Sequence, residues 1–205
     1  MSENLVEQIN ISGATTIGVV CKDGVILASE KRVSYGYMVM SKAGRKVFKI
    51  SPTIALACAG LISDMQTLSR EAAAYANLFK MEYNRPISVK ASAKLISNLL
   101  FQRGLRPLLT DTLVGGVDDE GPSLYVLDAV GSLLQDTFIA IGSGAEMAIG
   151  VLEAQYEDKM SFKDARELVL KAMTSSIRRD VMSGEGIDLM LISAEGISEE
   201  TLPPK

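Results

Sequence analysis

The side chains that could carry covalent chemistry in this chain are hydroxyls, lysines and carboxylates. A turn-prone Ser-Gly pair leads into Ala14-Thr15-Thr16, the start of a β-branched run typical of a strand. The 205 residues include no histidine, which excludes Ser-His and Cys-His catalysis and the usual zinc sites within this chain. If the chain hydrolyses a substrate, its base must therefore be a lysine, a carboxylate or a chain-terminal amine.

Further candidate residues follow at intervals along the sequence. The charged cluster Glu30-Lys31-Arg32 precedes a lone Lys46, which is set in Gly-Arg-Lys-Val-Phe. A Gly142-Ser143-Gly144 turn comes later, and then Asp180 and Ser183. Each piece alone fits an ordinary role, such as a solvated strand residue, a turn into a helix or a polar helix end. Their value as a catalytic set depends on their spacing.

That spacing resembles the pattern of the proteasome β-subunit family, whose mature chains begin with a catalytic threonine directly after a propeptide glycine. Here Gly13 is followed by Ala14. The family's lysine lies 32 residues beyond its threonine, which is the distance from Ala14 to Lys46. Counting from either of the next two threonines reaches Val47 or Phe48 instead, and neither side chain can assist a hydroxyl.

The resemblance implies a role for each remaining candidate. Glu30 falls at the position of the acidic partner of the lysine, where the family more often has aspartate, and Gly60 falls at the oxyanion-hole glycine. Ser143 matches the supporting serine of the family's GSG motif, and Asp180 and Ser183 match the acid and serine of RDxxSG. In that mechanism the threonine hydroxyl attacks the peptide, the free α-amine accepts its proton, and the lysine lowers the effective pKa of the hydroxyl.

Ala14 at the nucleophile position admits three interpretations. The chain is a naturally non-catalytic subunit of a particle that carries a second, active β chain, as in some archaeal members of the family that Leu27–Arg32 resembles. Alternatively, Ala14 is an engineered replacement of a catalytic threonine in an active-class chain. In the third interpretation Thr15 or Thr16 is the nucleophile and every other residue is out of register. In the first two interpretations no other side chain in these motifs takes over the attack on the peptide.

The hydrophobic pattern predicts blocks of strands and of helix pairs rather than alternating βαβ units, which is typical of an α+β fold. Strands are expected over residues 15–21, 25–30, 45–50, 53–59, 111–117, 123–128, 136–141 and 187–193. Helices are expected over residues 63–84, 88–104, 145–156 and 162–178, the first of them opened by a capping box, and a polar tail is expected after residue 193. The resemblance implies a four-layer αββα sandwich of two antiparallel sheets between helix pairs.

Domain organisation and compartment follow from the same features. The resemblance runs from Gly13 to about Ile192 and implies a propeptide-like leader over residues 1–13 and a single proteasome β-type domain over residues 14–205. The leader lacks the pattern of a secretory signal, and the longest apolar run, Thr53–Ile62, is shorter than the ~20 residues of a membrane helix. We therefore expect a cytoplasmic protein that does not enter a membrane.

Composition and resemblance together set the expected partners. A net charge of −4 argues against nucleic acid, and Cys21 and Cys58 lack CxxC spacing, so neither a metal nor a cofactor is expected. The resemblance implies proteasome α subunits and other β subunits in stacked rings, a regulatory ATPase acting through the α rings, and unfolded polypeptide as substrate. The function is then that of an inert structural subunit or of an active endopeptidase subunit; a small-molecule amidase is disfavoured because the motifs are the proteasome's.

Overall fold

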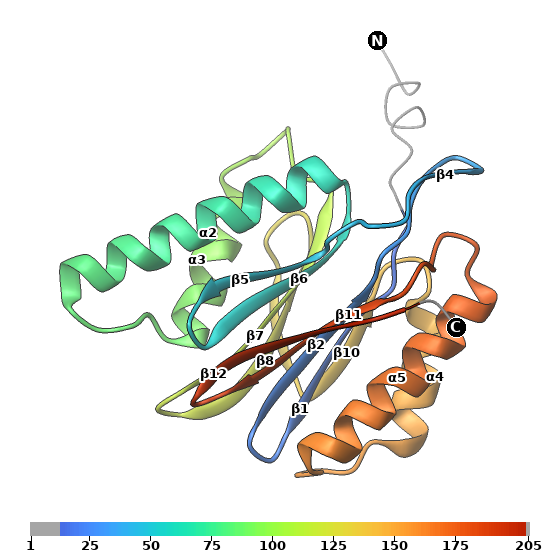
Figure 1. Ribbon diagram of the computed structural model, residues 1–205. Coiled ribbons are helices and arrows are strands. Elements are labelled where there is room, and N and C mark those ends of the chain that lie inside the picture. Colours follow the sequence, from blue (N-terminus) through green and yellow to red (C-terminus); the bar gives the residue numbers. More distant parts are fainter. Residues whose placement is uncertain (1–12, 204–205) are drawn as a thin grey trace.

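Two five-stranded antiparallel sheets lie face to face in the computed structural model, which describes residues 13–203 (Figure 1). The first sheet has the order β10 (Phe138–Ile141), β1 (Thr16–Cys21), β2 (Gly24–Glu30), β11 (Ile187–Ser193) and β12 (Gly196–Leu202). The second has the order β5 (Val47–Ser51), β6 (Ile54–Gly60), β7 (Thr110–Asp118), β8 (Gly121–Leu127) and β9 (Leu133–Asp136). Most of the predicted leader, residues 1–12, lies outside the described part of the chain.

Helix pairs cover the two outer faces of this sheet pair (Figure 1). They are α2 (Ile62–Tyr83) and α3 (Val89–Phe101) on the second sheet, and α4 (Ala145–Gln155) and α5 (Phe162–Arg179) on the first. A short hairpin of β3 (Val33–Tyr35) and β4 (Met38–Ser41) projects from the body. The predicted α+β class and its four-layer αββα sandwich are confirmed.

Each sheet is apolar on both faces because it packs against helices on one side and against the other sheet on the other. Along β2, Val25 and Leu27 point into the layer between the sheets, whereas Ile26 and Ala28 point toward α4 and α5. Every residue of β6 is buried in the same way. Fully burying one such aliphatic side chain contributes about 1.5–3 kcal/mol, so these continuous apolar strands need both partner layers.

The prediction of a polar tail after residue 193 is wrong, because this segment forms the edge strand β12. Its acidic side chains made the segment look solvated, but two of them reach arginines of neighbouring elements. Glu199 pairs with Arg45 at 2.7 Å, and Glu200 pairs with Arg166 of α5 at 2.6 Å. Charged side chains of this kind are common on an edge strand, where they oppose pairing with other chains.

The single strand predicted over residues 136–141 is in fact two strands in different sheets. Residues of β9 pair with β8, with Leu124 opposite Asp136, whereas β10 pairs with β1, with Val19 opposite Phe138. The chain crosses from one sheet to the other at Thr137, whose N–H donates to the Asp136 carboxylate at 2.7 Å. A continuous β pattern carries no mark of such a crossing, because both halves are equally strand-like.

Helix ends were predicted unevenly. Ser88 and Ser161 cap α3 and α5, since each hydroxyl accepts the N–H three residues on. The capping box predicted at residue 63 is wrong: α2 has Leu61 at its N-cap and no side-chain cap, and Asp64 instead accepts the Leu109 N–H at 2.8 Å.

In the part of the chain that the structure describes, no helix combines the length and apolarity needed to span a bilayer.

Candidate active site

A fully buried ion pair between Lys46 and Glu30 lies at the centre of the candidate site. Lys46 directly precedes β5, Glu30 ends β2, and each residue is 1% exposed. The Lys46 ammonium donates to Glu30 Oε1 and, at 2.7 Å, to the Arg32 carbonyl. Glu30 Oε2 accepts the N–H groups of Arg32 at 2.7 Å and Gly184 at 3.0 Å. Both charges therefore have the partners that a buried pair needs.

Burial is the largest influence on the protonation of this pair. It lowers the pKa of Lys46 because it disfavours the ammonium, although the Glu30 carboxylate and, more weakly, Asp180 oppose that shift. Burial likewise raises the pKa of Glu30, against the opposing effect of Lys46. A lysine whose pKa is lowered is better suited to exchange a proton during a reaction than an exposed lysine.

The second part of the site is a cluster of hydroxyls around the Asp180 carboxylate. Ser143, which precedes α4, and Ser183 both donate to Asp180 Oδ2 at 2.6 Å. Ser143 Oγ also lies 3.3 Å from the carbonyl oxygen of Ala14, so its single proton is shared between a short and a long contact, and the short one to Asp180 dominates. The cluster thus lies directly against Ala14, which is 1% exposed.

One loop joins the cluster to the ion pair. Ser183 belongs to the Asp180 cluster, and the next residue, Gly184, donates its N–H to Glu30. Gly184 in turn accepts the Arg32 N–H at 3.0 Å, and the Arg32 guanidinium donates to the Val181 carbonyl at 2.7 Å. No role beyond its charge could be assigned to Arg32 from the sequence, because the partners of its guanidinium lie about 150 residues further along the chain.

Three glycines shape the backbone around Ala14. Gly142 has φ +91, and a Cβ there would lie 2.2 Å from the Ala14 carbonyl oxygen. A Cβ on Gly13, the predicted propeptide junction, would lie 2.6 Å from Ser143 Oγ. Gly60 has φ +142 at the end of β6, where a Cβ would meet the Leu109 carbonyl at 2.2 Å. The close backbone approach explains Gly60 structurally, and its oxyanion role stays a prediction.

Comparison with known proteins agrees with this geometry. A family model described as proteasome subunit matches residues 11–192. The chain belongs to the proteasome subunit family. It is 45% identical over 196 residues to proteasome subunit beta 2 of Caldivirga maquilingensis, covering 96% of this chain and 98% of that protein. It is 46% identical over 194 residues to proteasome subunit beta 2 of Pyrobaculum calidifontis, covering 95% of each, and 46% identical over 187 residues to proteasome subunit beta 1 of Cenarchaeum symbiosum, covering 91% of this chain and 96% of that protein.

The resemblance to proteasome β subunits of the archaeal type is thereby confirmed, and membership of the family implies assembly with other proteasome subunits. The interpretation that moves the nucleophile to Thr15 or Thr16 finds no support in this proteasome-family site, because each hydroxyl already has a hydrogen-bond partner inside the fold. Burial does not distinguish the positions, since both threonines are 0% and Ala14 is 1% exposed. Thr15 Oγ1 lies 2.7 Å from Ser183 Oγ, and Thr16 Oγ1 donates to the Cys58 carbonyl at 3.0 Å.

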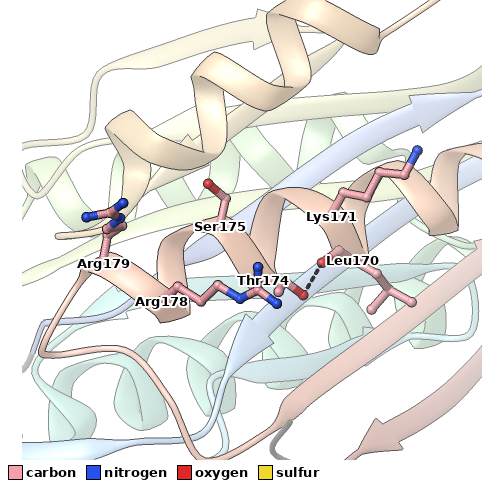
Figure 2. A pocket seen from close by; sticks show the side chains of 6 residues that line it. All are labelled: Leu170, Lys171, Thr174, Ser175, Arg178 and Arg179. Carbon is pink, nitrogen blue, oxygen red and sulfur yellow. Dashed lines mark hydrogen bonds between the residues drawn. The ribbon is translucent and has the colours of Figure 1, made fainter.

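A hollow of about 510 Å³ on the surface of this proteasome-family chain lies apart from these residues. Figure 2 shows that its lining comes from α5 alone: Leu170, Lys171, Thr174, Ser175, Arg178 and Arg179. The Thr174 hydroxyl donates to the Leu170 carbonyl of its own helix at 2.7 Å. The hollow therefore offers cations on a helix surface and no group from the Lys46 or Asp180 clusters.

The contact between Gly142 and Ala14 gives a prediction about stability. Gly142→Ala should destabilise the chain more than Gly121→Ala, because both glycines have positive φ (+91 and +101) but a Cβ on Gly121 meets no heavy atom within 4 Å. We expect Gly121→Ala to cost about 1–3 kcal/mol from backbone conformation alone, and Gly142→Ala to cost more. Urea unfolding of the two variants measures the difference, and equal losses would show that the Ala14 carbonyl moves freely.

Proposed function

We propose that this chain is a non-catalytic β subunit of the proteasome core particle, a threonine-type endopeptidase complex that degrades unfolded proteins. One observation carries the proposal: where Ser143 and Asp180 meet the start of β1, residue 14 presents a methyl group and no hydroxyl. The family resemblance supports the interpretation of the surrounding groups as that site, with Glu30 where the family more often has aspartate. A site that has every supporting group but no attacking atom can bind and position a peptide, but it forms no covalent bond with it.

Each supporting residue has a defined task in a chain with a hydroxyl at position 14. Lys46, held by Glu30, would stabilise the oxygen as it loses its proton, and the α-amine of residue 14 would accept that proton. The N–H of Gly60 would stabilise the oxyanion formed on the substrate carbonyl. The Asp180 cluster, with Ser143 and Ser183, would hold the amine end in place. These tasks support the assignment of the site residues. With Ala14 in place of a hydroxyl-bearing residue, the supporting groups have no nucleophile to assist.

The proposed partners are proteasome α subunits and other β subunits in stacked rings, with a regulatory ATPase acting through the α rings and an unfolded polypeptide within the chamber. Apolar side chains on the surface support extensive contacts with neighbouring chains. On α2, Leu78 is 57% and Met81 is 81% exposed, and on the β3–β4 hairpin Tyr35 is 57% and Met40 is 60% exposed. Apolar patches of this kind mark interaction surfaces, and we propose that assembly takes place in the cytoplasm.

The alternative is an active-class subunit in which an engineered change replaced a catalytic threonine with Ala14. The intact geometry favours this alternative as strongly as the first proposal, because Lys46, Glu30, Ser143 and Asp180 keep the contacts that an active site would need. The two differ in how completely a threonine at position 14 restores activity.

If the chain is non-catalytic, residues 1–13 should remain attached in the assembled particle. Self-cleavage between Gly13 and Ala14 needs a hydroxyl on residue 14 to attack the preceding carbonyl, and alanine has none. Intact-mass spectrometry of the assembled particle should therefore find the chain with its leader and no peptide hydrolysis assignable to it. A chain that begins at residue 14 in a particle whose other β chains are all inactive would contradict the proposal.

A further inference from the structure

The hydroxyl of Thr15 stands at the head of a hydrogen-bonded chain that ends on Asp180. Thr15 Oγ1 lies 2.7 Å from Ser183 Oγ, and Ser183 Oγ donates to Asp180 Oδ2 at 2.6 Å. A serine hydroxyl has one proton and a carboxylate has none to give. Because Ser183 uses its proton on Asp180, Thr15 must be the donor to Ser183. The direction of the chain is therefore Thr15 to Ser183 to Asp180.

Thr15 is also tied to the other half of the site through its backbone. Its carbonyl accepts the N–H of Glu30 at 3.3 Å, and the residue is 0% exposed. Its side chain fits closely against the turn before α4, since a Cβ on Gly144 would lie 2.0 Å from Thr15 Oγ1. One residue thus connects residue 14, the Glu30 strand end and the Asp180 loop.

From these contacts we infer that Thr15 is a positioning residue of the site, acting through Ser183 to fix the Asp180 carboxylate. Because Thr15 donates to Ser183, the Ser183 hydroxyl is oriented to donate its own proton to Asp180 Oδ2. This hydrogen bond holds Asp180 Oδ2 in the position where it also accepts the Ser143 hydroxyl. Ser143 in turn lies against the Ala14 carbonyl. Removing the Thr15 hydroxyl leaves a buried acceptor on Ser183 without its donor, and the Ser183 hydroxyl is then free to turn.

The first test uses the chain with Ala14 in place and does not depend on activity. Met182 donates its N–H to Asp180 Oδ1 at 3.1 Å, so hydrogen exchange at this amide reports how firmly the Asp180 loop is held. Thr15→Val should raise that exchange rate about tenfold or more relative to amides of β7, because the loop opens more often. Thr15→Ser, which keeps the hydroxyl, should stay close to the unmodified chain.

Thr16→Val is the matched control for this test. It removes an equally buried hydroxyl one residue away, but that hydroxyl lies 3.0 Å from the Cys58 carbonyl and 3.1 Å from Ser29 Oγ rather than against the Asp180 loop. Exchange at Met182 should therefore be unchanged in Thr16→Val. The inference is overturned if Thr15→Val and Thr16→Val raise exchange at Met182 equally, or if Thr15→Ser behaves like Thr15→Val.

The second test rests on the proposed function and uses particles that carry Ala14→Thr. Adding Thr15→Val should lower kcat by roughly 10- to 100-fold, as expected when a catalytic group is displaced by about 1 Å. KM should be nearly unchanged because Thr15 is buried and touches no substrate, and Thr15→Ser should restore kcat. An inactive Ala14→Thr particle would count against the proposed site, whereas the exchange test would still decide the role of Thr15.

Discussion

Ala14→Thr is expected to give the assembled particle peptidase activity and to release residues 1–13 from the chain. The new hydroxyl would belong to the residue that Ser143 of the Asp180 cluster already contacts, with the Lys46–Glu30 pair formed and buried. Attack on the Gly13 carbonyl would transfer the leader from the amide nitrogen to the hydroxyl oxygen of residue 14 as an ester. Hydrolysis of that ester by water would release residues 1–13, and the freed α-amine would then act as the base for peptide substrates. Intact mass and hydrolysis of a fluorogenic peptide measure the two events.

The gain should depend on Lys46. General acid–base assistance is typically worth about 100- to 10,000-fold in rate, so Ala14→Thr combined with Lys46→Ala should lose activity by that order. Lys49→Ala is the matched control, because Lys49 lies three residues further on in the same strand region and is exposed. The pair of lysines separates a catalytic loss from a general loss of positive charge. Processing in both double variants, or in neither, would show that Lys46 is not the partner of the hydroxyl.

The size of the gain also separates the two origins of Ala14. An engineered alanine should give full recovery, because the supporting groups were selected for activity and need only the hydroxyl. A naturally non-catalytic chain should recover in part, since groups without a reaction to support drift from the roughly 0.5 Å tolerance that catalysis requires. Comparison with the active β chain of the same particle supplies the reference rate.

Much of the candidate site could be predicted from the resemblance to the proteasome family, with spacing used to set the register. The distance from Ala14 to Lys46 selected the register, and the structure brings Lys46 and Glu30 into direct contact and gathers Ser143 and Ser183 on Asp180. The roles of these residues remain predictions until activity is measured. Their contacts could be anticipated because a family's motif records which distant segments meet.

What the sequence could not provide were contacts made by residues outside any motif. The sequence presented Thr15 only as a β-branched strand residue or as an out-of-register nucleophile, and the fold places its hydroxyl 2.7 Å from Ser183. The partners of Arg32 lie on a loop about 150 residues away. The edge strand β12 was missed because Glu199 and Glu200 read as solvated charges until their arginines were placed. In each case the deciding partner is distant in sequence.

The buried pair should also make stability depend on pH in opposite ways for its two halves. Lys46→Met leaves Glu30 buried without its cation, and Glu30→Gln leaves Lys46 without its anion. Breaking a buried pair from one side typically costs about 3–5 kcal/mol. Urea unfolding of the isolated chain should therefore show large losses at neutral pH for both variants.

The sign of each pH trend follows from the direction of the pKa shifts. Burial raises the pKa of Glu30 above its ordinary value of 4.5, and without Lys46 nothing opposes that rise. In Lys46→Met the folded state then keeps a proton on Glu30 that the unfolded state releases. The loss should be small near pH 4.5 and should grow as pH rises, by up to about 1.4 kcal/mol per pH unit.

Glu30→Gln should show the reverse trend, because burial lowers the pKa of Lys46 below its ordinary value of 10.5. The folded variant gives up a proton that the unfolded chain keeps, so its loss should be largest at low pH and should shrink as pH rises toward 10.5. Leu56→Ala, a fully buried change without a titratable group, should cost about 2–5 kcal/mol at every pH. If Lys46→Met and Glu30→Gln instead followed the flat profile of Leu56→Ala, water would have to reach the pair and the site would be open to solvent.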